Sequence, residues 1–282
     1  MSRFKVAGVQ MDIRFAEVEL NLQKMEIRLE ETVANGASLT VFPECTTTGY
    51  CFESNDEAKQ CGESIDGPSV TCVEEWCATK NTMVIFGFLE LENDRLYNSL
   101  ALLGPDGVIG IYRKIHLPFL GVDRFTTPGG RPPEVYQTPD VRVGMNICYD
   151  SSFPESARIL AIGGADLIAL PTNWPPTSGL TADLIPNARA LENHVYFMSV
   201  NRVGVERGFE FIGKSKICDP RGANLAFEDH AEEAILYAEI DPSFARKKHL
   251  VSIPGAHEVH RINDRRPDLY QSLTDPLEDA ED

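Results

Sequence analysis

The sequence predicts a single domain of the α/β class (α+β), with helices flanking two sheets, and three observations support this. Segments patterned as strands alternate with segments whose apolar residues recur at helical spacing, as in βα units. Hairpins with tight turns, such as Pro105-Asp106-Gly107, lie among these units and argue against a purely parallel sheet. No linker or abrupt change of composition divides the 282 residues. We place the domain at 1–273 and interpret 274–282, with five acidic residues, as a mobile tail.

The first half of the chain is predicted to begin with a strand over 4–10 and a long helix. In that helix the apolar residues recur every three or four positions until Asn35-Gly36, a C-cap signal. A second strand, over 38–42, stops at Pro43, so Glu44 lies at the carboxyl end of a strand, where α/β folds place their chemistry. We further expect a helix over 69–80 and strands over 83–91, 96–103 and 108–112.

The second half is predicted to follow the same scheme. A strand over 141–147 stops at Cys148, and a helix begins near Ser152, where Glu155 is placed to complete a capping box. We further expect a helix over 181–194 and strands over 165–170, 195–201, 211–218 and 234–240.

Composition and charge argue against several functional classes. The 26 lysines and arginines against 43 acidic residues give a net charge of −17, which opposes binding to nucleic acids and to anionic membranes. No apolar run approaches the roughly 18 residues of a membrane helix, and the first residues lack a secretory-signal pattern. The odd number of cysteines, seven, argues against a disulfide scaffold and favours a reducing cytoplasm. His257 and His260 are three positions apart, but we do not expect a metal site there.

Three residues at the ends of apolar runs suggest acyl-transfer chemistry: Glu44 after VFP, Lys114 in YRKIHLP and Cys148 in NICYD. A thiol supplies a nucleophile, a carboxylate takes its proton, and an ammonium neutralises the charge that develops on the attacked group. Each residue also has an ordinary structural alternative, which for Cys148 is a small buried hydrophobe. No histidine pattern of a thiol protease is present, so a carboxylate is the economical base, and we expect His116 to have a supporting role.

The expected position of Cys148, between a strand and the first turn of a helix, favours the catalytic interpretation. Free backbone N–H groups and the helix dipole at such a position lower the pKa of a thiol. The same N–H groups, including that of Tyr149, are placed to stabilise an oxyanion.

The segments VFPECTTTGY, YRKIHLP and NICYDSSFPESAR resemble the three signature segments of the nitrilase superfamily of carbon–nitrogen hydrolases. AGVQMD, PTNWP, ARALENHVYFMSVNRVG and GKSKICDPRG match the family in the same order, so the resemblance covers nearly the whole chain. It implies a four-layer αββα sandwich, no cofactor, and a homodimer or larger homo-oligomer. It also implies that Glu44 is the general base, that Lys114 stabilises the tetrahedral intermediate, and that Cys148 forms a thioester acyl-enzyme.

Two positions depart from the family pattern. Many members carry a further glutamate six residues before the proline of a Pro-Gly pair, and here Val122 holds that spacing from Pro128. Asp123, one position later, is the acidic candidate for this fourth role.

The second departure follows the nucleophile. Members that act on carbamoyl amino acids or carboxylate-bearing amides often have an arginine there, whereas this chain has Ser151 and Ser152. This disfavours such substrates unless Arg124 or Arg202 substitutes for the missing arginine.

The residues around the nucleophile favour one branch of the family. Cys148-Tyr149-Asp150 is more similar to amidases and carbamoylases than to true nitrilases, which usually have Cys-Trp-Glu. We expect Tyr50, Tyr149, Asn173 and Trp174 to bind substrate, although Tyr50 and Trp174 could instead plug the rim of the core.

We therefore interpret the chain as a cytoplasmic amidase that acts on a small-molecule linear carboxamide or N-carbamoyl compound and releases ammonia. Two alternatives stay open: hydrolysis of a nitrile by the same residues, and a non-catalytic, ligand-sensing homologue. The second is favoured only if Asp123 cannot fill the fourth role.

Overall fold

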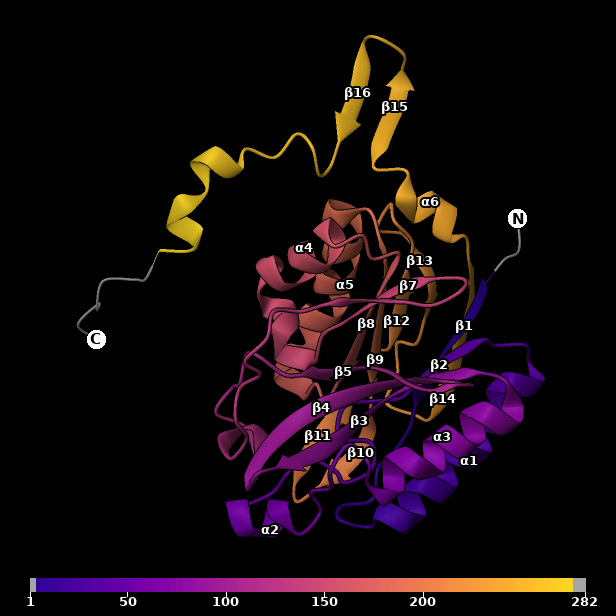
Figure 1. Ribbon diagram of the computed structural model, residues 1–282, viewed down its shortest axis with the longest axis vertical. Helices are drawn as coiled ribbons and strands as arrows, with labels where there is room; N and C mark the ends of the chain where they lie inside the picture. Colours follow the sequence, from indigo (N-terminus) through magenta and orange to yellow (C-terminus); the bar gives the residue numbers. More distant parts are fainter. Residues whose placement is uncertain (1–3, 276–282) are drawn as a thin grey trace. The chain divides into compact units, whose positions relative to one another are not determined.

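Two six-stranded mixed sheets form the centre of the computed structural model, which describes residues 4–275 (Figure 1). The first sheet has the order β14-β1-β2-β3-β4-β5. Its centre is parallel, because β1 and β3 both run parallel to β2, and antiparallel strands complete it on both sides. Its strands are β1 (Phe4–Gln10), β2 (Leu39–Val41), β3 (Met83–Glu92), β4 (Arg95–Gly104), β5 (Gly107–Arg113) and β14 (Ala234–Ile240).

The second sheet, of order β13-β12-β9-β8-β7-β6, repeats this plan. Strands β7, β8 and β9 are parallel, and the outer strands are antiparallel to their neighbours. Because both sheets have a parallel centre, the carboxyl ends of several strands lie at one edge of each sheet. In α/β folds these strand ends carry the functional residues. The strands of the second sheet are β6 (Val135–Gln137), β7 (Arg142–Met145), β8 (Leu167–Thr172), β9 (Tyr196–Asn201), β12 (Lys216–Cys218) and β13 (Asn224–Phe227).

Helices cover the outer faces of the two sheets. Helices α1 (Val18–Ala34) and α3 (Pro68–Lys80) pack against each other on the first sheet, and α4 (Pro154–Ile162) and α5 (Gly179–Asn193) pair on the second (Figure 1). Strands β1 and β9 are in contact between the sheets, so the order of layers is helix, sheet, sheet, helix. This confirms the predicted fold class. Two short helices, α2 (Asn55–Lys59) and α6 (Pro242–Arg246), and the hairpin of β10 (Val203–Glu206) and β11 (Phe209–Ile212) complete this part.

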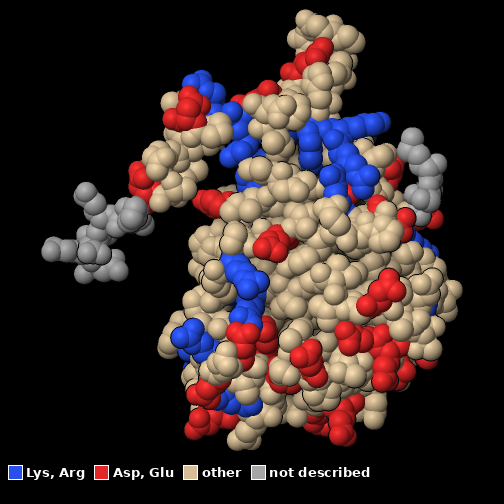
Figure 2. Space-filling view, viewed as in Figure 1, with Lys and Arg blue, Asp and Glu red and all other residues tan. Residues whose placement is uncertain are grey.

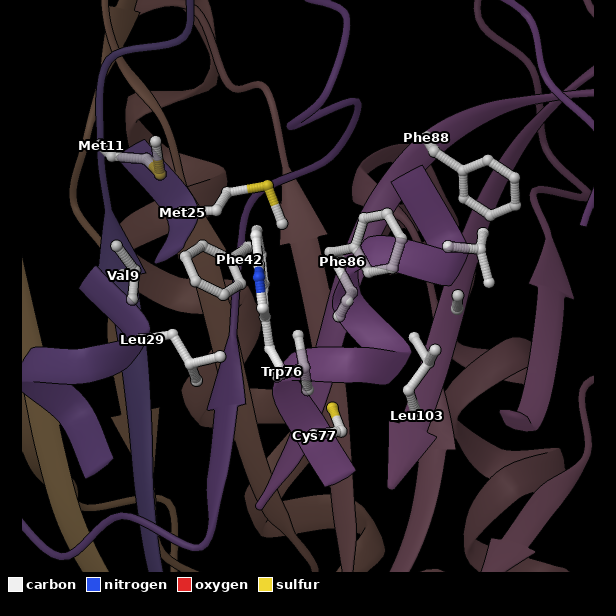
Figure 3. Close-up of a cluster of buried hydrophobic side chains, with 14 residues drawn as sticks. Val9, Met11, Met25, Leu29, Phe42, Trp76, Cys77, Phe86, Phe88 and Leu103 are labelled. Carbon is white, nitrogen blue, oxygen red and sulfur yellow. The ribbon is translucent and has the colours of Figure 1, made fainter. Parts of the chain in front are cut away.

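An apolar cluster fixes α1 and α3 on the first sheet. In Figure 3, Trp76 of α3 lies between Phe42 and Phe86 of β3, below the end of Met25 of α1. Burial of each such side chain contributes about 1.5–3 kcal/mol to folding. Because Phe42 lies two residues before Glu44, the same cluster anchors the loop that carries the predicted base. The outer surfaces of α1 and α3 are acidic, and red side chains gather on that side in Figure 2.

Two local predictions are corrected by the structure. The predicted capping box is wrong: α4 begins at Pro154 with Phe153 as N-cap and no side-chain cap, while Ser152 ends the 3₁₀ helix η2 (Cys148–Ser152). The reason is Pro154, which disfavours helical backbone at the preceding residue and is itself well suited to the first helical position. The predicted strand over 211–218 is interrupted, because β11 ends at Ile212 and β12 begins at Lys216.

Contacts divide the described chain into two units, one that ends at Arg246 and one that begins at Lys247. The second unit contains the hairpin of β15 (His249–Ile253) and β16 (His257–His260), followed by the 3₁₀ turns η4 (Pro267–Leu269) and η5 (Gln271–Leu273). The domain boundary at 273 stays a prediction, and most of the predicted acidic tail, 276–282, lies outside the described residues. Between residues 4 and 275, no helix is both long and apolar enough to cross a membrane.

Candidate active site

The structure brings Glu44 and Lys114 together in the interior. Glu44 follows β2 and Lys114 follows β5, two strands that are separated in the sheet by β3 and β4. Both side chains are fully buried, and Lys114 Nζ lies 2.8 Å from Glu44 Oε1. The loop after β2 reaches this position because it crosses β3 at Gly87, where a Cβ would collide with the backbone of Glu44 and Cys45.

Asp123 is the second carboxylate partner of Lys114. It belongs to the 3₁₀ helix η1 (Gly121–Arg124), and its Oδ2 lies 2.5 Å from Lys114 Nζ. The hydroxyl of Tyr50 donates to the same oxygen at 2.7 Å. The amide of Asn98, on β4, donates to Asp123 Oδ1 at 2.9 Å and to Glu44 Oε1 at 2.7 Å. The acidic candidate one position away from the family spacing therefore completes a buried cluster around the lysine.

Two polar groups in this region have no hydrogen-bond partner among residues 4–275. Glu44 Oε2 is buried and unpaired, although Oε1 of the same carboxylate has two partners. The side-chain amide of Asn173 is buried and unpaired at both Nδ2 and Oδ1. Asn173 directly follows β8, and its backbone N–H acts to lower the pKa of the nearby Cys148 thiol. An unpaired buried polar group costs about 1–3 kcal/mol, so both side chains are available to hydrogen-bond a bound molecule.

Cys148 begins η2 with a left-handed backbone conformation at φ +41°. For a residue other than glycine this conformation costs about 1–3 kcal/mol, so the surrounding structure must hold it. The Ser151 hydroxyl donates to the carbonyl of Cys148 at 2.7 Å, and the Arg189 guanidinium donates to the Ser151 carbonyl at 2.9 Å. Ser151 therefore supports the turn around the predicted nucleophile, residues 147–153, which we call the nucleophile turn.

The expectation that the turn lowers the pKa of Cys148 is wrong. Burial raises this pKa well above its usual range, and the nearby Glu44 carboxylate raises it further. Lys114 and the backbone N–H of Asn173 act in the opposite direction but do not offset the burial. A short 3₁₀ turn next to a carboxylate does not provide the positive environment that an α-helix N-terminus on the surface offers. The thiol is therefore protonated at neutral pH, so a base must remove its proton before the sulfur can act as a nucleophile.

The charges of the other two groups suit that requirement. Burial raises the pKa of Glu44 above its ordinary value of 4.5, with a further increase from Asp123 and an opposing effect from Lys114. A carboxylate with a raised pKa is a stronger proton acceptor. Burial alone would lower the pKa of Lys114, but the charges of Asp123 and Glu44 more than offset it and hold that pKa well above its usual range. Lys114 therefore remains a cation.

The predicted substrate-binding residues have different positions. Tyr50 and Asn173 are buried and contact the cluster or the thiol, as described above. Tyr149 is 39% exposed, and its ring packs edge-on against Phe153 with centroids 5.2 Å apart. Trp174 is buried, and its backbone N–H donates to the Asn201 side chain at 2.8 Å.

Two cavities lie next to the segments that carry Tyr50 and Lys114, and neither is lined by Glu44, Lys114 or Cys148. A cavity of about 290 Å³ is lined by residues next to Tyr50 and Asp123 in the sequence, including Cys51, Gly121 and Arg124. A cavity of about 580 Å³ lies behind the lysine segment, at the strand edge that includes Tyr97, Tyr112 and Arg113. The smaller cavity adjoins the loops of the buried cluster, so it is the better candidate for the outer part of a substrate.

The two arginines considered as carboxylate partners differ in availability. Arg202 is fully buried and is paired with Glu206 and with the carbonyl of Ile13. Arg124 lines the 290 Å³ cavity and donates to the carbonyls of Gly121 and Phe52. Of these two arginines, Arg124 is the one that lines a cavity.

Sequence reasoning missed Asn98 as a site residue. It joins both carboxylates of the cluster, and its Oδ1 also lies 3.6 Å from the thiol of Cys45. The available signal was the polar pair Asn98-Ser99 within the strand YNSLALL, since a buried polar side chain in a strand needs specific partners.

Fold and site together define a cysteine-dependent hydrolase of carbon–nitrogen bonds. Residues 5–249 match the family model described as carbon-nitrogen hydrolase, and the chain belongs to this family of the nitrilase superfamily.

Its relatives carry different activity names. The chain is 39% identical over 270 residues to a protein named nitrilase from Pyrococcus abyssi, with 94% of this chain and 98% of the relative covered. It is 33% identical to an (R)-stereoselective amidase of a Pseudomonas species, with 84% and 85% covered. Among solved structures, an amidase from a Nesterenkonia species superposes with a TM-score of 0.80 at 21% identity, with 96% and 97% covered. The family is thus established, and its members similar to this chain include proteins named nitrilase and amidase.

Proposed function

We propose that this protein is an amidase that hydrolyses a linear carboxamide or N-carbamoyl compound and releases ammonia. The observation that carries the proposal is the pair of buried, unpartnered groups near the thiol, Glu44 Oε2 and the Asn173 side-chain amide. A primary amide offers two N–H donors and one carbonyl acceptor, so it can satisfy both groups. The nitrogen of a nitrile is only an acceptor and would leave Glu44 Oε2 unpaired.

The first half of the reaction forms a thioester. Glu44 takes the proton of the Cys148 thiol while the sulfur attacks the carbonyl carbon. The negative charge that develops on the carbonyl oxygen is stabilised by the Lys114 ammonium, with the backbone N–H of Tyr149 as a further donor. Collapse of the tetrahedral intermediate breaks the C–N bond. The leaving nitrogen takes the proton from Glu44 and departs as ammonia.

The second half regenerates the enzyme. A water molecule gives one proton to Glu44 and attacks the thioester carbonyl, and the C–S bond then breaks. The thiolate recovers its proton from Glu44, and the acid is released. In this scheme Asp123 acts through Lys114 by holding its charge and position. A mutant of the Nesterenkonia amidase shows covalent addition of the acetamide moiety of fluoroacetamide at its active-site cysteine, which supports a covalent role for Cys148.

The test is a comparison of matched amide and nitrile pairs with the same carbon skeleton, assayed by ammonia release. We expect kcat/KM to be higher for the amide of each pair. Asn173→Ala should lower kcat/KM for amides by about tenfold, because one hydrogen bond to a substrate is lost, and should affect nitriles less. A higher kcat/KM for nitriles, or an equal effect of Asn173→Ala on both classes, would contradict the proposal.

Nitrile hydrolysis is the second candidate, and the name of the Pyrococcus abyssi relative is the observation that favours it. The same comparison separates the two candidates. The non-catalytic alternative depended on a failure of Asp123 to fill the fourth role, and the contact of Asp123 with Lys114 argues against that condition.

We further propose that the protein forms a homodimer or larger homo-oligomer through the paired helices α4 and α5. These helices expose Ile159 and Ile162 on α4 and Leu180, Leu184 and Leu191 on α5. Apolar patches of this kind mark association surfaces. Light scattering coupled to size exclusion should give a mass above 31.3 kDa, and Leu184→Lys should reduce it. A wild-type particle of 31.3 kDa would exclude the assembly.

We also propose a reducing compartment such as the cytoplasm as its location. All seven cysteines are free thiols, as expected of a protein in a reducing environment. A fluorescent fusion expressed in the source cell should therefore be excluded from oxidising compartments.

A further inference from the structure

A buried carboxylate outside the catalytic cluster joins the lysine segment to the nucleophile turn. Asp150, two residues after Cys148, has no exposed side-chain surface. Its Oδ2 accepts from the Tyr112 hydroxyl at 2.8 Å and from the backbone N–H of Ile147 at 2.9 Å. Its Oδ1 accepts from the backbone N–H of His116 at 3.1 Å and contacts His116 Nδ1 at 2.7 Å. A carboxylate only accepts hydrogen bonds, so Nδ1 carries the proton in this contact.

The partners of Asp150 flank both reactive side chains. Tyr112 and His116 lie two residues before and two residues after Lys114, and Ile147 immediately precedes Cys148. Lys114 follows a strand of the first sheet, whereas Cys148 follows a strand of the second. The hydrogen bonds of Asp150 therefore connect the sheets at the point where their two reactive groups must meet.

The His116 ring is fixed on its other side by Phe153. The two rings are stacked, with centroids 3.7 Å apart and an interplanar angle of 9°. Phe153 itself belongs to the nucleophile turn, because its backbone N–H donates to the carbonyl of Asp150 at 3.1 Å. His116 thus contacts the turn through a hydrogen bond and a stacking face. A ring that served only to fill space would not need both.

We propose that His116 and Asp150 are positioning residues that set the distance and orientation between Lys114 and Cys148. The roles of those two residues rest on the proposed function, but the geometric coupling does not. Cys148 has a left-handed backbone that the turn must hold, and displacements of about 1 Å between reacting groups cost about 100-fold in rate. The Nδ1–H bond to Asp150 is the specific link.

Two substitutions of His116 separate this link from packing. His116→Asn places an amide nitrogen on Cγ, where Nδ1 is attached, whereas His116→Gln places it one bond further along the side chain. Both variants lose the stacked ring, so they are matched in that respect. The first readout is the rate at which iodoacetamide alkylates Cys148, followed by intact mass, with Cys148→Ala reporting the background from other cysteines. This readout needs no substrate, so it remains informative if the amidase proposal fails.

We expect His116→Gln to slow alkylation by about tenfold, because a displaced Lys114 no longer favours the thiolate. On a substrate, kcat should fall by about 10- to 100-fold while KM changes little. His116→Asn should recover both values to within about threefold of the wild type. Equal losses in both variants, or no loss in His116→Gln, would overturn the proposal.

A second variant keeps the test decisive if His116→Gln does not fold. Tyr112→Phe deletes one hydroxyl and therefore one of the hydrogen bonds to Asp150. We expect it to slow alkylation of Cys148 by about threefold to tenfold, with unchanged KM. An unchanged alkylation rate in a folded Tyr112→Phe protein would contradict a positioning role for this carboxylate.

Discussion

The substitution Asp123→Asn removes one negative charge from the buried cluster while preserving the size of the side chain. Asp123 accepts from three donors: Lys114 at 2.5 Å, Tyr50 at 2.7 Å and Asn98 at 2.9 Å. An asparagine has a single acceptor oxygen, and its amide group would face a donor. At least one of the three partners therefore loses its acceptor.

The expected magnitude follows from burial. Removing one partner of a buried ion pair costs about 3–5 kcal/mol, and here Glu44 remains as a second partner of Lys114. We therefore expect the free energy of unfolding to fall by about 3 kcal/mol, the lower end of that range. For a protein of this size, this lowers Tm by about 6–12 °C.

The same substitution shifts the pH dependence of catalysis. The charge of Asp123 raises the pKa of Glu44, so its removal should lower that pKa. Glu44 must be ionised to act as a base, and kcat/KM falls as pH decreases through its pKa. The acid limb of the pH profile should therefore move to lower pH in Asp123→Asn, even though the maximal rate decreases.

Thermal denaturation and a pH profile of ammonia release measure these two effects. Asp94→Asn is the matched control, because Asp94 pairs with Lys59 at 2.7 Å but is 89% exposed. Such a surface pair contributes about 0–1 kcal/mol. Asp123→Glu should recover part of the activity, since it restores the carboxylate. If Asp123→Asn matched the control in Tm and left the acid limb in place, the assignment of Asp123 to the cluster would be refuted.

Three other substitutions test separate parts of the structure. Glu44→Gln should lower kcat by about 10²- to 10⁴-fold, while iodoacetamide still alkylates Cys148, because the charge of Glu44 raises the thiol pKa; a loss of both would point to misfolding. Gly87→Ala should destabilise the protein by about 1–3 kcal/mol in denaturant unfolding and reduce turnover, whereas Gly130→Ala, where a Cβ meets no atom within 4 Å, should do neither. Equal behaviour of the two glycine variants would contradict the close approach at β3. Arg246 and Arg142 lower the pKa of Asp166 despite its burial, so its contribution to stability is present above the unfolded pKa and is lost as pH falls through the folded pKa. Asp166→Asn should therefore reduce the free energy of unfolding at neutral pH and flatten its decline in acid, and parallel curves for variant and wild type would exclude this effect.

Local patterns were sufficient to predict most of the regular structure. The predicted strands over 4–10 and 234–240 have the observed ends of β1 and β14, and Asn35 is the C-cap of α1. These elements depend on apolar periodicity and on turn residues, both of which are visible in the sequence. The start of α4 was missed because the effect of Pro154 on its neighbour outweighs the capping preference of Ser152.

The site could be predicted only in part, because its details depend on contacts between distant segments. The strand ends indicated where Glu44 and Lys114 lie. The contact of Asp123 with Lys114 depends on the 3₁₀ helix η1, whose first residue, Gly121, has φ +50° and leaves space only for the Tyr50 ring. The sequence shows only that Asp123 lies one position after the spacing typical of the family. It gives no sign of the 3₁₀ turn η1 or of the contact between Gly121 and the Tyr50 ring.

The pKa of Cys148 illustrates the same limit. Its position after a strand suggested a lowered pKa, but the observed increase comes from burial and from the charge of Glu44. Both are properties of the packed structure. In the proposed mechanism, a protonated thiol makes the general base essential.

The most direct test of the account is the mass of the enzyme quenched in acid during turnover of a primary amide. The account predicts an adduct with the mass of the acyl group, mapped to Cys148, and no adduct or turnover in Cys148→Ala. Turnover of the amide by Cys148→Ala, or an acyl group mapped to another residue, would contradict the proposed thioester mechanism.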